Sequence, residues 1–266
     1  MSSSLAADTG GTYDPAYFRQ LFAVEDRHFW FRSRNAVIGA AMHRVAAGLP
    51  DGYRVLEVGC GTGTVLRTLA HACARGDVFG MDLFMEGLSF ARRRTDCALI
   101  QADIHAPPFA APFDVIGMFD VLEHLPDDVG VLRSVRRILP TGGYLLATVP
   151  AHPALWSYFD EASHHRRRYT AASLADCLRA SGFEVEYLSP YMAALLPVLW
   201  LVRRVAGRLV PGDPRADARA AAELRIVPGL NALLSCLLKP EARRVAGRRA
   251  MRHGTSLLVI ARKAGE

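Results

Sequence analysis

The sequence lacks the features that mark secreted, zinc-binding or membrane-spanning proteins. Its five cysteines form no C-x-x-C pair and match no Cys/His spacing of a zinc site. Residues 1–12 are small and polar and are predicted to be disordered, and the first thirty residues hold no apolar signal-peptide core. The apolar stretch 191–202 is twelve residues long, whereas a membrane span needs about twenty. These absences predict a cytosolic protein in a reducing compartment, with no resident metal.

About half of the residues (51%) are apolar, which is enough for a sizeable core without disulfides. The net charge of +6 is unevenly distributed, since residues 200–266 hold 14 Lys and Arg against 5 Asp and Glu. One interpretation of this basic segment is a solvated helix face. The other is a surface for anionic lipid head groups or for a substrate that carries phosphate.

Short apolar runs alternate with helical patterns along most of the chain. Strands are predicted at 53–58, 77–81, 97–103, 113–119, 144–150, 183–189 and 254–263. Helices are predicted within 14–48 and at 63–75, 84–94, 127–139, 170–181, 191–209 and 228–250, with Thr170 as an N-cap. Repeated strand–helix units predict an α/β fold with a mostly parallel sheet and helices on both faces.

The most specific motif is VLEVGCGTG at residues 55–63, which ends the first strand and precedes a helix. Glycines there let the backbone approach a bulky ligand at the carboxyl edge of the sheet. The spacing is G-x-G-x-G rather than the G-x-G-x-x-G of dinucleotide-binding enzymes, and Glu57 stands two places before Gly59. In these residues the sequence resembles the class I, seven-stranded, Rossmann-like methyltransferases that use S-adenosylmethionine (SAM).

Acids at later strand ends extend the resemblance through residues 53–150, together with the D-V-L-E-H run at 120–124 and the P-T-G-G turn at 140–143. The resemblance implies that Asp82 holds the ribose hydroxyls of SAM, that Asp103 and Ile104 meet adenine, and that Asp120 lies beside the methionine moiety. It also implies a seventh strand inserted antiparallel between the fifth and sixth. The cofactor positions predicted in this way are Glu57, Gly59, Cys60, Gly61, Gly63, Asp82, Leu83, Asp103, Ile104, Asp120 and Val121.

Candidates for acceptor chemistry lie in three further segments, of which the first contains His124. In the family a histidine at this place often faces the site, and the alternative is a residue that only shapes the pocket. LWSYFDEASHHRRRYT (155–170) resembles a segment that lines the acceptor pocket in related enzymes, although its arginines could instead pair with Asp and order a loop. DRHFWFRSRN (26–35), which includes Phe31, resembles a cofactor lid, or else packs into the core. The catalytic candidates are His124, His164, His165 and Tyr169, and the candidates for acceptor binding are His28, Trp30, Arg34, Trp156, Asp160 and Arg167.

Three regions are predicted. Residues 1–48 form an N-terminal helical lid, 49–190 with 252–266 form the SAM-binding domain, and 191–251 form an inserted helical cap before the last strand. The apolar stretch 191–202 is interrupted by Pro197, and it fits a core helix, a wall of the acceptor pocket or a helix lying on a membrane surface. An apolar roof over the site would suit a hydrophobic acceptor.

The function predicted from the sequence is transfer of a methyl group from SAM to an O, N or C atom of a small hydrophobic or amphiphilic acceptor. In-line displacement would leave S-adenosylhomocysteine (SAH), with a histidine as an optional base. One alternative is a methyltransferase acting on nucleic acid, which the sequence disfavours because Pro107-Pro108-Phe109 precedes the fourth strand rather than following it. A second alternative is a SAM-binding module without catalysis. A third is an NAD-dependent oxidoreductase, which the glycine spacing disfavours. No nucleic-acid partner is expected, and the sequence predicts no oligomeric state.

Overall fold

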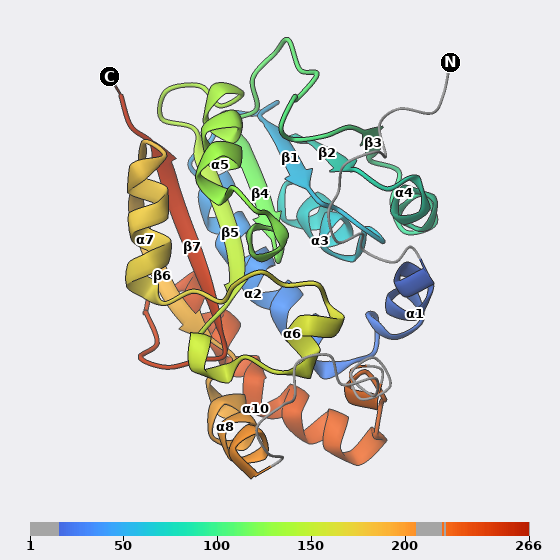
Figure 1. Ribbon diagram of the computed structural model, residues 1–266. Coiled ribbons are helices and arrows are strands. Elements are labelled where there is room, and N and C mark those ends of the chain that lie inside the picture. The colour runs from blue at the N-terminus through green and yellow to red at the C-terminus, as the bar shows by residue number, and fades with distance from the viewer. Residues whose placement is uncertain (1–15, 206–219, 221, 266) are drawn as a thin grey trace.

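The computed structural model describes residues 16–205, 220 and 222–265 (Figure 1). The prediction of disorder for residues 1–12 lies outside this range, as does the last part of the helix predicted at 191–209. Seven strands form one sheet in the order β3-β2-β1-β4-β5-β7-β6. The strands are β1 (Arg54–Val58), β2 (Asp77–Asp82), β3 (Ala98–Gln101), β4 (Val115–Phe119), β5 (Tyr144–Pro150), β6 (Phe183–Tyr191) and β7 (Ser256–Lys263).

All neighbouring pairs from β3 to β5 are parallel, whereas β7 pairs antiparallel with both β5 and β6. The predicted fold is therefore confirmed, including the place of the last strand. Because the chain order turns back at β1 and β4, a crevice opens at the carboxyl ends of these two strands. The sheet topology thus fixes where a ligand can enter.

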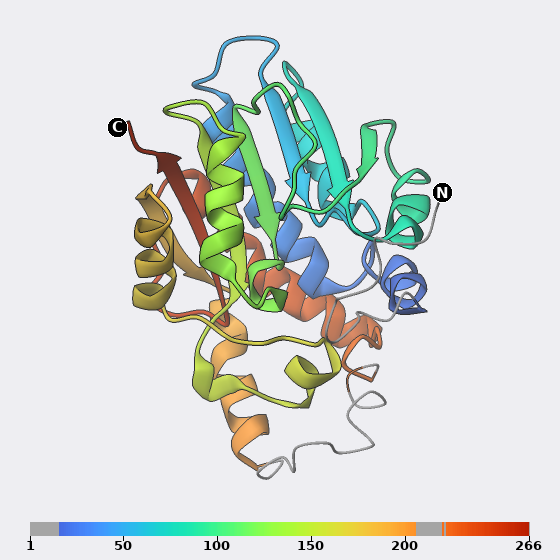
Figure 2. The ribbon, with the colours of Figure 1, turned by 45° about the horizontal axis from the view of Figure 1, so that its top comes forward.

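Helices cover both faces of the sheet (Figures 1 and 2). One core cluster joins α5 (Asp128–Arg137) and α7 (Ala171–Ala180) to the sheet through apolar residues such as Leu132, Leu174 and Leu56. The opposite cluster joins α2 (Phe29–Ala46), α3 (Thr64–Ala72) and α10 (Pro228–Ala246) through residues such as Ile38 and Val55. Successive residues of β1 therefore feed opposite faces, as the period of two in a strand requires.

The segments outside the sheet are shorter or placed differently than predicted. The N-terminal pattern divides into α1 (Ala16–Val24) and α2, and α4 spans Met85–Ala91. Three 3₁₀ turns were not predicted, namely η1 (Leu122–His124), η2 (Pro153–Leu155) and η3 (Ala193–Leu195), nor was the short helix α6 (Tyr158–Ala162). Thr170 caps α7 by accepting a hydrogen bond from the Ser173 backbone N–H, as predicted.

The apolar stretch 191–202 and the helix that follows it differ in detail from the prediction. Its first residue still belongs to β6, and α8 (Leu196–Val205) begins immediately before Pro197. Proline is favourable in the first turn of a helix because no partner is needed there for its missing N–H, so it does not interrupt the element. Farther along, α10 lies against α2, so the inserted segment rests on the N-terminal helices (Figure 2). No helix within the described ranges is long and apolar enough to cross a membrane.

Candidate functional site

The loop between β1 and α3 is turned tightly across the end of β2. The backbone N–H groups of Gly59 and Cys60 both donate to the Met81 carbonyl, at 2.8 and 3.0 Å. Gly59 has φ +72°, and a Cβ there would lie 2.6 Å from Cγ2 of Val121. Only glycine combines this dihedral with such close packing, so the loop requires glycine at position 59.

Gly61, Cys60 and Gly63 of the predicted loop have different surroundings. Gly61 lines the cavity described below, with φ +48°. The Cys60 thiol packs in an apolar cluster with Leu66 and Leu88. Gly63 does not line the cavity, because it is the left-handed N-cap of α3 and approaches Ala91, 2.9 Å from the position of a Cβ. Its place in the structure is therefore one that allows α3 and α4 to pack closely, and contact of Gly63 with cofactor stays a prediction.

Asp82 ends β2 and holds the glycine loop in place. Its side chain is 6% exposed, and its two oxygens accept hydrogen bonds from the backbone N–H groups of Gly61 at 2.7 Å and Phe84 at 2.9 Å. Burial raises the pKa of Asp82, although these hydrogen bonds oppose the rise. Each carboxylate oxygen can accept a second hydrogen bond, so Asp82 is both a structural anchor and a candidate ligand group. Leu83 lines the cavity next to it.

Glu57 lines the cavity with a carboxylate that protein groups leave partly unsatisfied. It is 2% exposed, and its Oε2 has no hydrogen-bond partner among the described residues. Burial raises the pKa of Glu57 well above its usual range, while the charge of Arg34 opposes the rise. A buried oxygen without a donor is costly unless a ligand supplies one. Glu57 thus fits a ligand that presents an N–H or O–H group.

Asp120 follows β4 in a strained backbone conformation, with φ +57°. Its oxygens accept from Nη1 of Arg34 at 2.9 Å and from Oγ1 of Thr148 at 3.1 Å. The Arg34 guanidinium also lies over the rings of Trp30 and Phe31, at 5.1 and 5.4 Å from their centroids. All of these except Thr148 line the cavity. The predicted lid residue Arg34 therefore stands beside the predicted cofactor residue Asp120.

Asp103 and Ile104 follow β3 and also line the cavity. The Asp103 carboxylate is half-exposed and accepts from His105 twice, through the backbone N–H at 2.9 Å and through Nδ1 at 2.7 Å. Burial would raise the pKa of Asp103, but the hydrogen bonds from His105 outweigh it and lower the pKa. His105 was not predicted as a site residue, although its position next to Asp103 could have indicated it.

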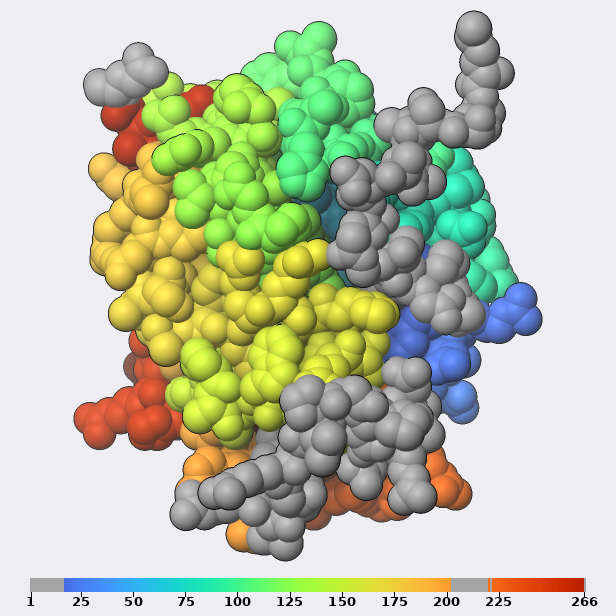
Figure 3. Space-filling model, in the orientation of Figure 1, coloured from blue at the N-terminus to red at the C-terminus, as the bar shows by residue number. Residues whose placement is uncertain are grey.

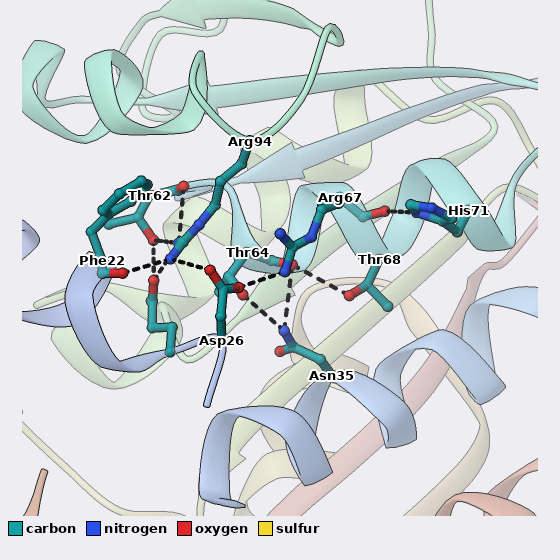
Figure 4. A network of polar contacts seen from close by, with 10 residues as sticks. Phe22, Asp26, Asn35, Thr62, Thr64, Arg67, Thr68, His71 and Arg94 are labelled. Atoms are coloured by element: carbon teal, nitrogen blue, oxygen red, sulfur yellow. Dashed lines mark hydrogen bonds and ion pairs between the residues drawn. The ribbon is translucent and has the colours of Figure 1, made fainter. Parts of the chain in front are cut away.

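The N-terminal helices are tied to the glycine loop by a polar network (Figure 4). Arg94, after α4, donates to Glu25 at 2.5 Å and to the Thr62 carbonyl at 3.2 Å, and the Thr62 hydroxyl also donates to Glu25. Asn35 of α2 donates to the Thr64 hydroxyl at 3.0 Å. No sequence pattern predicts this network, because its members are far apart along the chain and each is of a residue type common on protein surfaces.

His28 begins α2, where its ring accepts from the Trp30 backbone N–H at 3.3 Å. Its other ring nitrogen lies 3.3 Å from the Glu223 carbonyl, so it bridges the lid to the inserted segment. Burial lowers the pKa of His28, which keeps the ring neutral near pH 7. His28 and Trp30 both line the cavity, as predicted for residues close to a ligand, but His28 also has this capping role.

The segment between β5 and α7 crosses the carboxyl edge of the sheet, and it is the yellow and yellow-green surface in Figure 3. Trp156, His164 and His165 from this segment line the cavity. His165 and His124 stand edge to face, with ring centroids 4.9 Å apart. Burial and the neighbouring His165 lower the pKa of His124 to about 3, which makes His124 a weak base at pH 7.

Three residues predicted in this segment do not line the cavity and hold the segment in place instead. Asp160 is fully buried and accepts from His165 at 2.9 Å and Arg168 at 2.6 Å. Arg167 pairs with Asp128 at 2.7 Å, and the Tyr169 hydroxyl donates to Asp128 at 2.7 Å. The structure thus gives all three residues partners within the protein, and the predicted acceptor-binding role of Asp160 and Arg167 and the predicted catalytic role of Tyr169 have no support from the cavity lining. The alternative of Arg–Asp pairing describes this segment.

One cavity of about 1260 Å³ joins these groups. The glycine loop, the acids that follow the strands, and His124 and His165 supply the polar lining, which we call the polar half. Apolar side chains come from η3, α8, the inserted segment and α10, and we call them the apolar half. They are Leu195, Val198, Leu199, Leu224, Leu230 and Leu234. One cavity therefore combines both kinds of lining.

A family model described as a methyltransferase domain matches residues 30–188. A protein of Mycolicibacterium smegmatis named a probable S-adenosylmethionine-dependent methyltransferase is 30% identical over 63% of this chain and 64% of its own length. The ubiquinone biosynthesis O-methyltransferase of Thiobacillus denitrificans is 31% identical over 52% of this chain and 67% of its own length. The matches thus span about two thirds of the length of these curated relatives.

Solved structures show the same fold at lower identity. The phosphoethanolamine N-methyltransferase 2 of Haemonchus contortus, in complex with SAM, has a TM-score of 0.59 at 18% identity, covering 99% of this chain and 61% of that one. The plantazolicin methyltransferase BpumL, in complex with a triazolic desmethylPZN analogue and SAH, has a TM-score of 0.60 at 12% identity, covering 95% of this chain and 92% of that one.

Proposed function

Because this chain belongs to the class I SAM-dependent methyltransferases, we propose that it methylates a small hydrophobic or amphiphilic acceptor held in the apolar half of its cavity. The observation that carries the proposal is the division of one cavity between strand-end acids and an apolar wall. Small-molecule sites are typically apolar with a few placed polar groups. The O-methyltransferase relative favours an acceptor hydroxyl, and nitrogen and carbon acceptors are the alternatives.

The residues present fit SAM in the polar half of the cavity. Glu57 offers a buried oxygen without a protein donor, and Gly59 and Gly61 leave room where a Cβ would intrude. We assign the ribose hydroxyls to Asp82, the adenine to Asp103 and Ile104, and the methionine end to Arg34 and Asp120. When bound, SAM supplies a methyl group on a sulfonium leaving group.

The chain's own contribution is alignment and exclusion of water. Arg34 and the Glu25 network hold the N-terminal helices against the glycine loop, while the Asp160 pairs hold the 155–170 segment over the other side. Fixing two reactants in line can supply a large part of a methyl-transfer rate. His124 is not assigned the role of general base, because its low pKa leaves the ring little basicity.

The acceptor half is tested by two adjacent leucines of α10. Leu234 lines the cavity, whereas Leu233 does not and is 56% exposed. In an assay of methyl transfer to a panel of hydrophobic phenols, Leu234→Gln is expected to raise KM about 10-fold or more. The partly buried side chain would become an amide that a bound apolar acceptor covers without giving it a hydrogen-bond partner, which costs more than about 1 kcal/mol. Leu233→Gln is expected to leave KM unchanged. Equal effects of the two substitutions, or no turnover of any apolar acceptor by folded wild-type protein, would contradict the proposal.

The same region exposes an apolar face, which we propose rests on an anionic membrane surface that supplies amphiphilic acceptors. The face contains Val198, Trp200, Leu201, Leu230, Leu233 and Leu237, each more than half exposed. Val198 and Leu230 also line the cavity, so the face borders the acceptor site. Exposed basic residues of α10, including Lys239 and Arg243, add attraction to anionic head groups.

Vesicle sedimentation tests this surface. Wild-type protein is expected to bind phosphatidylglycerol vesicles and to be released by salt. Leu233→Gln is expected to reduce binding several-fold, because it removes apolar area that the membrane would cover. Leu234→Gln, which changes the cavity rather than the surface, serves as the matched control. Sedimentation that is unaffected by Leu233→Gln would exclude this face as the contact.

A further inference from the structure

We propose that Glu123, His124 and His165 form a binding site for a divalent transition-metal ion in the wall of the cavity. Each residue offers one ligand atom, and the three atoms all lie within 4.8 Å of one another. Glu123 and His124 belong to η1 after β4, and His165 comes from the segment after α6. All three residues line the cavity. His124 and His165 are predicted separately as catalytic candidates and Glu123 is not predicted, and only folding brings His165 to the other two.

Glu123 supplies the independent sign of a ligand. Its side chain is 1% exposed, and its Oε2 has no hydrogen-bond partner among the described residues. A carboxylate oxygen left this way loses its hydration without replacement, which costs several kcal/mol unless a cation or donor meets it. The Glu123 carbonyl accepts from the Arg166 backbone N–H at 2.8 Å, so the loop that carries His165 is fixed beside the carboxylate.

The two histidines are oriented as metal ligands usually are. Nδ1 of His165 lies 2.9 Å from Oδ1 of the fully buried Asp160, which is itself held by Arg168. With Nδ1 donating to that carboxylate, the lone pair stands on Nε2. The His124 ring forms a hydrogen bond with the backbone of His164. A carboxylate or carbonyl on the second ring nitrogen is the common partner of a metal-ligating histidine, because it fixes both tautomer and ring direction.

The donor set indicates which ions fit. Two imidazole nitrogens and one carboxylate oxygen suit Zn²⁺, Fe²⁺ or Co²⁺, whereas Mg²⁺ and Ca²⁺ prefer oxygen ligands throughout. Three protein ligands leave at least one coordination position, and all three ligand residues line the cavity from which an acceptor could reach it. The site therefore has the composition of a catalytic metal site rather than of a closed structural one.

The role that follows rests on the proposed function. An acceptor hydroxyl bound to the ion would lose its proton to water at a lower pH than when free. The acceptor oxygen then forms a bond to the methyl carbon while the carbon–sulfur bond breaks and its electron pair goes to sulfur, which yields the methyl ether and SAH. In this step the metal would take the place of a basic side chain.

Visible absorption with Co²⁺ tests the site directly. Metal-free wild-type protein is expected to bind one Co²⁺ with ligand-field bands that Zn²⁺ removes and Mg²⁺ does not. Glu123→Gln and His165→Gln, which keep approximate shape, are each expected to weaken Co²⁺ binding at least about 10-fold, as loss of even an outer partner does. His71→Gln, an exposed histidine on α3, is the control.

The outcomes separate this inference from the proposed function. Wild-type protein that binds SAM by calorimetry but gives no Co²⁺ bands, or variants that keep those bands, would overturn the metal site and leave the methyltransferase proposal intact. Conversely, Co²⁺ binding should persist in Asp82→Ala, since Asp82 is not in the ligand set. Co²⁺ binding without any binding of SAM would sustain the metal site and refute the cofactor assignment.

Discussion

Replacing Asp82 with alanine is expected to weaken SAM binding on the order of 100-fold. The substitution removes the acceptors that we propose for the ribose hydroxyls, and hydrogen bonds to a charged group are worth about 1.5–3 kcal/mol each. It also releases the backbone N–H groups of Gly61 and Phe84, which Asp82 holds at 2.7 and 2.9 Å. The loss therefore combines missing contacts with a loosened glycine loop. Calorimetric titration with SAM and SAH measures it.

Asp77→Ala is the matched control for this experiment. Asp77 begins the strand that Asp82 ends, and it is exposed at the opposite edge of the sheet. Its substitution removes a carboxylate from the same strand at a position that does not line the cavity, so SAM affinity should stay as in wild type. If Asp82→Ala bound SAM as tightly as Asp77→Ala does, the ribose would have to lie elsewhere, and the carboxyl edge of β2 would lose its assigned role.

Much of the cofactor half of the site was predictable because it follows from topology. Acids at the ends of parallel strands must gather at one edge of the sheet, so Asp82, Asp103 and Asp120 share a cavity wherever the strand order is right. The glycine spacing located the loop for a similar reason, since few residues can adopt φ near +72° beside Val121. Local chemistry and strand order were therefore enough to predict which of these residues share the cavity.

The acceptor half was less predictable because a loop sequence does not show which way its side chains point. Asp160, Arg167 and Tyr169 have the polarity of ligand-binding groups, but the fold turns Asp160 toward Arg168 and turns Arg167 and Tyr169 toward Asp128. The Glu25–Arg94 contact was invisible for a related reason, because it joins α1 to the end of α4 across a long stretch of chain. Such pairings depend on tertiary packing, which no local pattern records.

The Asp160→Ala substitution is accordingly expected to act on stability, with a loss of about 3–5 kcal/mol in the free energy of unfolding. Asp160 is fully buried, and Arg168, whose side chain is 6% exposed, would become a buried charge without its partner. The Ser157 backbone N–H, which donates to Asp160 at 2.8 Å, would also lose its acceptor. Urea unfolding followed by circular dichroism measures the change.

Asp176→Ala provides the comparison, because it breaks an Asp–Arg pair of similar length on the surface. The Asp176–Arg179 pair spans 2.8 Å with both side chains more than 60% exposed, so its loss should cost less than about 1 kcal/mol. A direct acceptor ligand at position 160 would give a different result, with KM raised and unfolding almost unchanged. A large loss of stability in Asp160→Ala alone would identify Asp160 as the residue that holds His165 and the 155–170 segment over the cavity, and any fall in turnover would follow from that displacement.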